Sequence, residues 1–240
     1  MLDLPLSYLH RPAASASASA SASASASASA SSTGSAGAPA PWLLVLMHGV
    51  GSNEQDLFGL APYAPAPFHV LSLRAPYRMG PNANAWFEFS VNPDGSRTIN
   101  VPQEAASRVL VAQTVDRAAQ QLGVPAQRVV VGGFSQGGIM ALSLLLTRPD
   151  LLQGAMALHS RLLPQVLPQA VPAAALRGRQ LWVSHGTQDN VIPLASAHAI
   201  RDHAATLPVD LVYREYPGMH EIRPAELQDA MGWLQGLAQA

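Results

Sequence analysis

A serine flanked by glycines separates an apolar run from a helical pattern in the middle of the chain. Residues 133–138 read Gly-Phe-Ser-Gln-Gly-Gly and follow the Val-rich run at 128–132. In a sharp strand-to-helix turn, side chains two positions before and after the serine would collide with neighbouring backbone, and glycines at those positions remove them. Such a turn exposes the Ser135 hydroxyl and directs the Gln136 N–H toward the same point. The spacing predicts a serine nucleophile for acyl transfer, with an ordinary tight turn as the alternative.

A serine hydroxyl needs a base and an orienting acid, and two later loops supply candidates. Asp189 lies just after an apolar run, and His220 lies between another such run and the last helical pattern. The order Ser, Asp, His along the chain is one of the known arrangements of such a triad. We therefore expect Ser135, Asp189 and His220 to meet at one edge of a sheet. For each loop residue taken singly, a solvated position is the alternative.

Other Asp and His residues are weaker candidates for the acid and the base of the triad. Asp202 and His203 lie within a helical pattern, where they are expected to face solvent. Asp210 begins a strand pattern and so belongs to the opposite edge of the sheet. His185 is expected to be a structural residue beneath the loop of the candidate acid, and His48 to shape the loop that it begins.

Glycines also surround Val50, shortly after the apolar run at 42–47. Acyl transfer places negative charge on an oxygen, and each backbone N–H that stabilises this charge contributes about 3 kcal/mol. We expect the N–H groups of Val50 and Gln136 to form this oxyanion hole, because Gly49 and Gly51 let the backbone approach a substrate closely. A glycine-rich turn without function is the alternative.

Strand and helix patterns alternate around these positions. Continuous apolar runs predict buried strands, and apolar residues at helical spacing predict helices. The strands are expected at 42–47, 68–73, 128–132, 154–158, 180–184 and 209–214, and the helices at 104–122, 137–147, 195–206 and 224–237. This alternation predicts an α/β fold with a mainly parallel, twisted sheet and helices on both faces. Ligands of such folds bind beyond the carboxyl ends of the strands.

The first forty residues differ in composition from the rest. Residues 14–31 alternate strictly between Ala and Ser. Side chains this small cannot stabilise a fixed backbone, so we expect residues 13–41 to be a flexible insertion, with a silk-like strand as the alternative. Residues 1–12 are expected to contribute an edge strand, and residues 42–240 to form the remaining domain.

Composition excludes several classes of function. The 240 residues include no cysteine, and all 14 basic residues are arginine. Thiolate nucleophiles, disulfides, cysteine-based metal sites, lysine Schiff bases and Walker-type phosphate sites are therefore excluded. The net charge of −1 argues against a nucleic-acid partner. No apolar run approaches the length of a membrane span, and no secretory signal pattern is evident, so a cytoplasmic location is expected.

Five segments in order resemble the phospholipase/carboxylesterase family of α/β-hydrolases, which includes acyl-protein thioesterases and small bacterial esterases. They read HGVGSNE from 48, AWF from 85, GFSQGG from 133, HGTQD from 185 and GMH from 218. The resemblance runs from about Trp42 to Trp233. It implies the α/β-hydrolase fold with a minimal lid, no metal or organic cofactor, and often a homodimer. The chain departs from the family pattern at two places, and both departures are expected to alter the pocket. Ser52 stands where many members have Asp, and residues 159–161 read His-Ser-Arg instead of the usual Ser-Gly-Arg.

The residues that bind the substrate are predicted from their types and positions. Trp86 and Phe87 are expected to wall the acyl pocket, with a place in the core as the alternative. Leu162 is expected to contact substrate, because it begins an apolar, proline-broken segment at 162–172. This segment is either a short cap over the acyl site or a packed connector.

Three arginines have no evident acidic partner in the sequence. They are Arg74, Arg78 and Arg161. A guanidinium group can bind a substrate carboxylate or phosphate, but solvation at the surface is the expectation for each of them.

Together these patterns predict a serine hydrolase that cleaves carboxylic esters or thioesters of small or acyl-chain substrates through an acyl-enzyme. A serine peptidase is the alternative among enzymes, because the same triad cleaves amides. No extra domain or long lid for peptide recognition is evident in the sequence. Two alternatives lie outside enzymes: a binding module that keeps the fold without turnover, and a scaffold whose Ala-Ser arm recruits partners.

Overall fold

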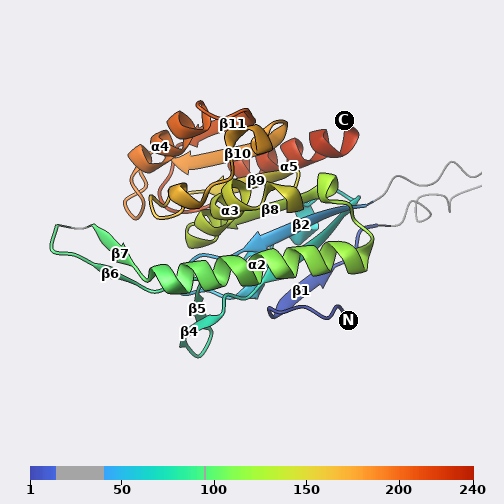
Figure 1. The fold of residues 1–240 in the computed structure, drawn as a ribbon, viewed down its shortest axis with the longest axis horizontal. Helices are drawn as coiled ribbons and strands as arrows, with labels where there is room; N and C mark the ends of the chain where they lie inside the picture. Colours follow the sequence, from blue (N-terminus) through green and yellow to red (C-terminus); the bar gives the residue numbers. More distant parts are fainter. Residues whose placement is uncertain (15–40, 95) are drawn as a thin grey trace, which may run out of the picture.

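A seven-stranded sheet forms the centre of the computed structural model, which describes residues 1–14, 41–94 and 96–240 (Figure 1). The strand order is β1-β3-β2-β8-β9-β10-β11. All neighbouring pairs are parallel except β1 and β3. The strands are β1 (Tyr8–Arg11), β2 (Trp42–Met47), β3 (Phe68–Leu73), β8 (Val129–Phe134), β9 (Gly154–Leu158), β10 (Arg179–Gly186) and β11 (Val209–Tyr216). The predicted α/β fold with a mainly parallel sheet is confirmed.

The N-terminal strand β1 lies at one end of the sheet. It pairs antiparallel with β3, with Tyr8 opposite Leu73 and Arg11 opposite Val70. The Ala-Ser tract that follows lies almost entirely outside the described residues, so its predicted flexibility is still a prediction.

Helices cover both faces of the sheet (Figure 1). Buried side chains place α2 (Val101–Leu122), α3 (Gln136–Thr147) and α4 (Leu194–Ala204) on one face. The short α1 (Glu54–Phe58) and the last helix, α5 (Pro224–Gln239), pack on the other. Among the described residues, no helix combines the length and the apolar character needed to cross a membrane.

The central strand β2 shows why the strand residues are apolar without alternation. Successive side chains of a strand point to opposite faces of the sheet, and here both faces are covered. Leu43, Val45 and Met47 therefore pack beneath α2 and α3. Leu44 and Leu46 pack beneath α1 and α5.

The sequence patterns did not predict two small hairpins between β3 and α2. They are β4 (Tyr77–Gly80) with β5 (Ala83–Ala85), and β6 (Phe89–Val91) with β7 (Arg97–Ile99). The β6–β7 hairpin extends away from the sheet in Figure 1. Such short, half-exposed strands lack the apolar run on which the strand prediction rests.

Short 3-10 turns join the main elements at Ala61–Tyr63, Ala126–Arg128, Pro149–Leu151, Leu167–Gln169 and Ala173–Leu176. The segment at 162–172 is a packed connector and not a cap. Leu163 and Val166 are buried in the core, and the Val171 N–H donates to the Leu146 carbonyl of α3.

Candidate active site

Ser135 occupies a strained turn between β8 and α3. Its backbone angles are φ 54° and ψ −115°, a region that non-glycine residues adopt rarely and at a cost of about 1–3 kcal/mol. The turn is held by the Ser135 N–H, which donates to the Leu158 carbonyl, and by the Ser160 hydroxyl, which donates to the Ser135 carbonyl. A Cβ atom on Gly137 would lie 1.9 Å from the Met47 carbonyl oxygen, so only glycine fits there.

The structure brings the predicted serine, histidine and aspartate into one hydrogen-bonded chain. The Ser135 Oγ lies 2.9 Å from His220 Nε2, and His220 Nδ1 lies 2.6 Å from Asp189 Oδ2. An ionised carboxylate only accepts hydrogen bonds, so Nδ1 carries the imidazole proton and Nε2 is free to accept from the hydroxyl. This is the tautomer that a general base for Ser135 requires.

Asp189 is held in its ionised form. Its Oδ1 accepts hydrogen bonds from the Val191 and Ile192 N–H groups. Burial alone would raise the pKa of Asp189, but hydrogen bonds from His220 and from these two N–H groups lower it below its ordinary value. His185 lies beneath this loop as predicted: its Nε2 donates to the Ile192 carbonyl, and it is buried.

The pKa of His220 is lowered. Burial is the main cause, because it disfavours the charged imidazolium. Contact with Asp189 opposes this effect, and repulsion from His159 and Arg97 adds to it. His220 is therefore held in the neutral, basic form at neutral pH.

We expect kcat/KM for an ester to fall on the acid side with a midpoint below pH 6.5, the ordinary pKa of histidine. Below the midpoint the rate should fall about tenfold per pH unit, because only neutral His220 can accept the Ser135 proton. The measurement is kcat/KM for p-nitrophenyl acetate between pH 4.5 and 9, with circular dichroism to verify that the fold persists. A midpoint above pH 6.5 would contradict the assignment of His220.

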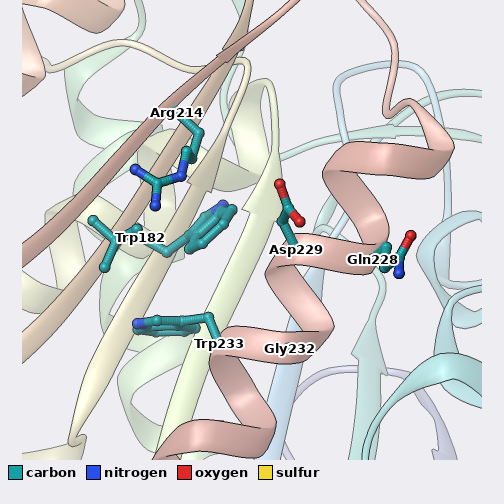
Figure 2. A pocket seen from close by; sticks show the side chains of 7 residues that line it. Trp182, Arg214, Gln228, Asp229, Gly232 and Trp233 are labelled. Atoms are coloured by element: carbon teal, nitrogen blue, oxygen red, sulfur yellow. The ribbon is translucent and has the colours of Figure 1, made fainter.

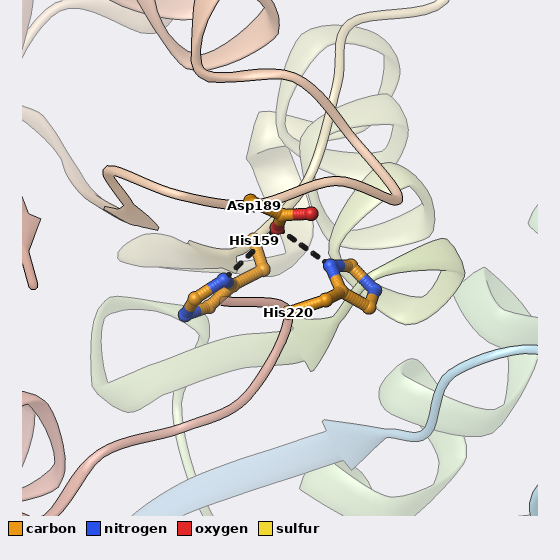
Figure 3. A group of neighbouring side chains, drawn as sticks. All are labelled: His159, Asp189 and His220. Carbon is orange, nitrogen blue, oxygen red and sulfur yellow. Dashed lines mark hydrogen bonds and ion pairs between the residues drawn. The ribbon is translucent and has the colours of Figure 1, made fainter. Parts of the chain in front are cut away.

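A second histidine contacts the same carboxylate, and the sequence analysis did not assign it a role. His159 Nδ1 lies 3.2 Å from Asp189 Oδ2, so His159 and His220 converge on one oxygen (Figure 3). On its other side, His159 Nε2 lies 3.1 Å from Oε2 of Glu226, in the first turn of α5. The Ser184 hydroxyl donates to the other oxygen of Glu226. His159 and Glu226 are both fully buried.

His159 is placed to carry a positive charge. Burial lowers its pKa, but hydrogen bonds and attraction from Glu226 and Asp189 outweigh burial, and the net pKa is raised. Both ring nitrogens face carboxylate oxygens and must donate to them, which favours the imidazolium. The Gly186 N–H also approaches Nδ1, but at 3.4 Å this contact is longer than the one to Asp189. The sequence signal for this arrangement is the departure at 159–161.

Among the described residues, His159, Asp189 and His220 form a group whose ligand atoms lie close enough to consider a metal ion. Two ligands of a tetrahedral ion lie about 3.3 Å apart, from bond lengths of about 2.0–2.1 Å. The 2.6 Å contact between His220 and Asp189 is too short for this geometry. The donor set fits a chain of hydrogen bonds better than a metal site, and the absence of a metal stays a prediction.

The candidate oxyanion donors lie beside the serine. Val50, Ser135 and Gln136 line one narrow cavity. No hydrogen bond engages the Val50 N–H within the described residues. The Gln136 N–H begins α3, where the first amides have no acceptor in their own helix. Both N–H groups are therefore available to a ligand in this cavity.

The three residues predicted to bind the acyl group occupy different places. Phe87 lines the cavity with Ser135. Trp86 is fully buried and does not line it; its indole N–H donates to the His48 carbonyl. Leu162 lines a separate apolar pocket between α3 and α4. The predictions that Trp86 and Leu162 form the acyl pocket therefore differ from the structure, because the connector packs into the core and does not fold over Ser135.

The Gln136 side chain holds the backbone at Trp86 and Phe87 in place, a role that the sequence analysis did not predict. Its amide accepts from the Trp86 N–H and donates to the Phe87 carbonyl. His48 acts similarly on the other side: its Nε2 accepts from the Ala75 N–H. These contacts tie the loops after β2, β3 and β8 together, as predicted for His48.

The three arginines expected at the surface differ from one another. Arg74 forms an ion pair with Glu54, although half of its side chain is exposed. Arg78 is exposed and donates to the Gly80 carbonyl. Arg161 is the exception to the prediction, because it lines the cavity of Ser135 and its Nε is buried.

A larger hollow lies away from these residues. It is located between α5 and the strands β10 and β11, and Trp182, Arg214, Asp229 and Trp233 line it (Figure 2). Ser135, His220 and Asp189 do not contribute to its lining. It brings together no candidate nucleophile and base, so the cavity beside Ser135 is the candidate active site.

Comparisons with known proteins agree with this arrangement. A sequence profile of the Phospholipase/Carboxylesterase family matches residues 29–237. A probable carboxylesterase of Oryza sativa subsp. japonica is 26% identical over 208 residues, which cover 79% of this chain and 85% of the rice protein. An acyl-protein thioesterase 1 of Gibberella zeae is 32% identical over 129 residues, which cover 52% of this chain and 53% of that protein.

Solved structures share the fold. A Bacillus cereus carboxylesterase superposes with a TM-score of 0.74 at 18% identity, covering 97% of this chain and 94% of that one. The family profile spans well over half of the sequence and includes Ser135, Asp189 and His220. The resemblance seen in the sequence is therefore confirmed, and the chain belongs to the phospholipase/carboxylesterase family of α/β-hydrolases.

Proposed function

We propose that the protein hydrolyses carboxylic esters or thioesters with Ser135 as nucleophile, His220 as general base and Asp189 as the orienting acid. The observation that carries this proposal is the chain of hydrogen bonds from Ser135 Oγ through His220 to Asp189, with distances of 2.9 and 2.6 Å. Family membership and the cavity beside Ser135 support it further.

The reaction proceeds in two halves. Ser135 Oγ attacks the acyl carbonyl carbon while His220 Nε2 takes its proton, and the imidazolium is stabilised by Asp189. The tetrahedral intermediate collapses, the bond to the alcohol or thiol breaks, and His220 protonates the leaving group. Water then attacks the acyl-enzyme with His220 again as base, which releases the carboxylic acid and restores Ser135.

The developing negative charge is stabilised by the N–H groups of Val50 and Gln136. Each of them is worth about 3 kcal/mol in the transition state. Both backbone groups belong to loops held by buried hydrogen bonds, through His48 for the first and through the Gln136 side chain for the second. The donors are thus positioned before substrate arrives, and little reorganisation accompanies the reaction.

A fluorophosphonate probe tests the proposal directly. We expect one probe per chain, attached to Ser135 and identified by mass spectrometry of the proteolysed protein. The labelled protein should lose its turnover of p-nitrophenyl esters and acyl thioesters. A folded protein that stays unlabelled would refute the proposal and favour a binding module without turnover. Cleavage of peptide p-nitroanilides faster than esters would favour a serine peptidase.

Three further expectations are still predictions: a homodimer, a cytoplasmic location, and domain boundaries at residues 13 and 42. Size-exclusion chromatography with light scattering measures whether the protein is a homodimer.

A further inference from the structure

Two arginines line the same cavity as Ser135. Arg97 comes from β7, and Arg161 lies in the loop after β9. The other lining side chains are uncharged: Val50, Phe87, Phe89, Ser135, Gln136, Ile139 and Ile192. Among the residues that the structure describes, the lining therefore carries two guanidinium groups and no carboxylate.

Arg161 has no partner in the described part of the protein. Its Nε is buried without an acceptor, and no hydrogen bond or ion pair involves its side chain. Burial lowers the pKa of Arg161, and repulsion from Arg97 lowers it further. A guanidinium still stays protonated at neutral pH. Arg161 is half-buried, and no carboxylate neutralises its charge within the described residues, so binding an anion there is favoured.

Arg97 is fixed in place but not neutralised. Its Nη2 donates to the Val191 carbonyl, and its guanidinium carbon lies 5.0 Å from the centre of the Phe89 ring. Neither contact supplies a negative charge. Repulsion from Arg97 contributes to the lowered pKa of His220, so the positive field extends to the triad.

We propose that Arg97 and Arg161 bind a carboxylate at the far end of a short acyl chain, so that the substrates are monoesters or monothioesters of short dicarboxylic acids. This inference rests on the proposed function of Ser135. The planar guanidinium donors match a carboxylate geometrically, and the pairing is strong where water is excluded. Phe87 and Ile139 supply apolar walls for the methylene groups between the two ends. The cavity beside Ser135 is narrow, which favours a short acyl chain over a long one.

The test compares two methyl esters with the same number of acyl carbons, monomethyl glutarate and methyl pentanoate, by methanol release at pH 8. At this pH His220 is neutral in every variant, so a change in its pKa does not affect the result. The wild-type ratio of kcat/KM is expected to favour monomethyl glutarate by at least about tenfold, the effect of one or two hydrogen bonds to a charged group. Arg97→Gln and Arg161→Gln should each reduce this ratio toward one.

Arg177→Gln is the matched control. Arg177 is exposed near the amino end of β10, so its loss removes the same charge far from the cavity and should keep the ratio. Each result is the ratio of kcat/KM for the two esters, measured on the same variant. A smaller fraction of folded protein lowers both values equally and does not change their ratio.

The outcomes separate this inference from the proposed function. A wild-type ratio of one or less, with methyl pentanoate still hydrolysed, overturns the inference and leaves the esterase function intact. No turnover of any ester, together with no labelling of Ser135, overturns the proposed function itself. Acetoxyacetate, compared with ethyl acetate by acetate release, carries its charge on the leaving group. If this ester shows the arginine-dependent preference instead, the assignment of the carboxylate to the acyl chain is wrong.

Discussion

Ser135→Ala lowers kcat for ester hydrolysis by an expected factor of about 10⁴ to 10⁶, which leaves only the catalysis that binding and the oxyanion hole provide. The variant loses the atom that forms the acyl-enzyme, while His220 and Asp189 stay 2.6 Å apart. The measurement is turnover of p-nitrophenyl acetate at pH 8. Circular dichroism should show an unchanged fold, because alanine is smaller than serine and the hydrogen bonds that hold the turn use the backbone N–H and carbonyl of Ser135.

Ser196→Ala provides the control for this prediction. Ser196 is partly exposed near the start of α4, and no side-chain hydrogen bond involves it in the described structure. The control should keep wild-type turnover. If Ser135→Ala retained more than a few per cent of the activity, another residue would have to be the nucleophile.

Gly137→Ala is expected to lower the free energy of unfolding by at least about 3 kcal/mol, the upper range for an overpacked core. The added Cβ would lie 1.9 Å from the carbonyl oxygen of Met47 and 2.4 Å from its carbonyl carbon. These are backbone atoms of β2, so no side chain can rotate away. Relief requires α3 to move from β2, which would also displace Ser135. Urea unfolding, followed by tryptophan fluorescence, measures the effect.

Gly232→Ala makes the same change inside α5, where a Cβ would meet nothing within 4 Å. Alanine is the better helix former, so this control should raise the free energy of unfolding by roughly 0.5–1 kcal/mol. Gly137→Ala and Gly232→Ala both replace a helical glycine by alanine, so helix propensity changes in the same way. They differ in the contacts that the new Cβ makes with the rest of the protein. Gly137→Ala with wild-type or greater stability would contradict the close approach of α3 to β2.

Local patterns predicted most of the scaffold. The strands at 42–47, 68–73 and 154–158 match β2, β3 and β9 to the residue. Continuous apolar runs are reliable here because these strands are covered on both faces. The β4–β5 and β6–β7 hairpins escaped prediction, because short strands outside the core carry no such run.

The acyl pocket was harder to predict than the nucleophile. Trp86 and Phe87 are adjacent in sequence, but only Phe87 reaches the cavity. The Trp86 side chain points into the core, where its indole N–H donates to the His48 carbonyl. Which of two neighbours faces a cavity depends on loop conformation, and no periodicity encodes it.

The sequence by itself determined the fold class and named Ser135, Asp189 and His220, because a glycine-spaced turn is a local requirement and parallel strands end at a common edge. Only the tertiary structure decided what surrounds them. His159 meets Glu226 across 67 positions of the chain, and Arg161 shares a cavity with Arg97. Such meetings depend on how helices and hairpins pack, and packing is set by contacts between distant residues that a local pattern does not contain.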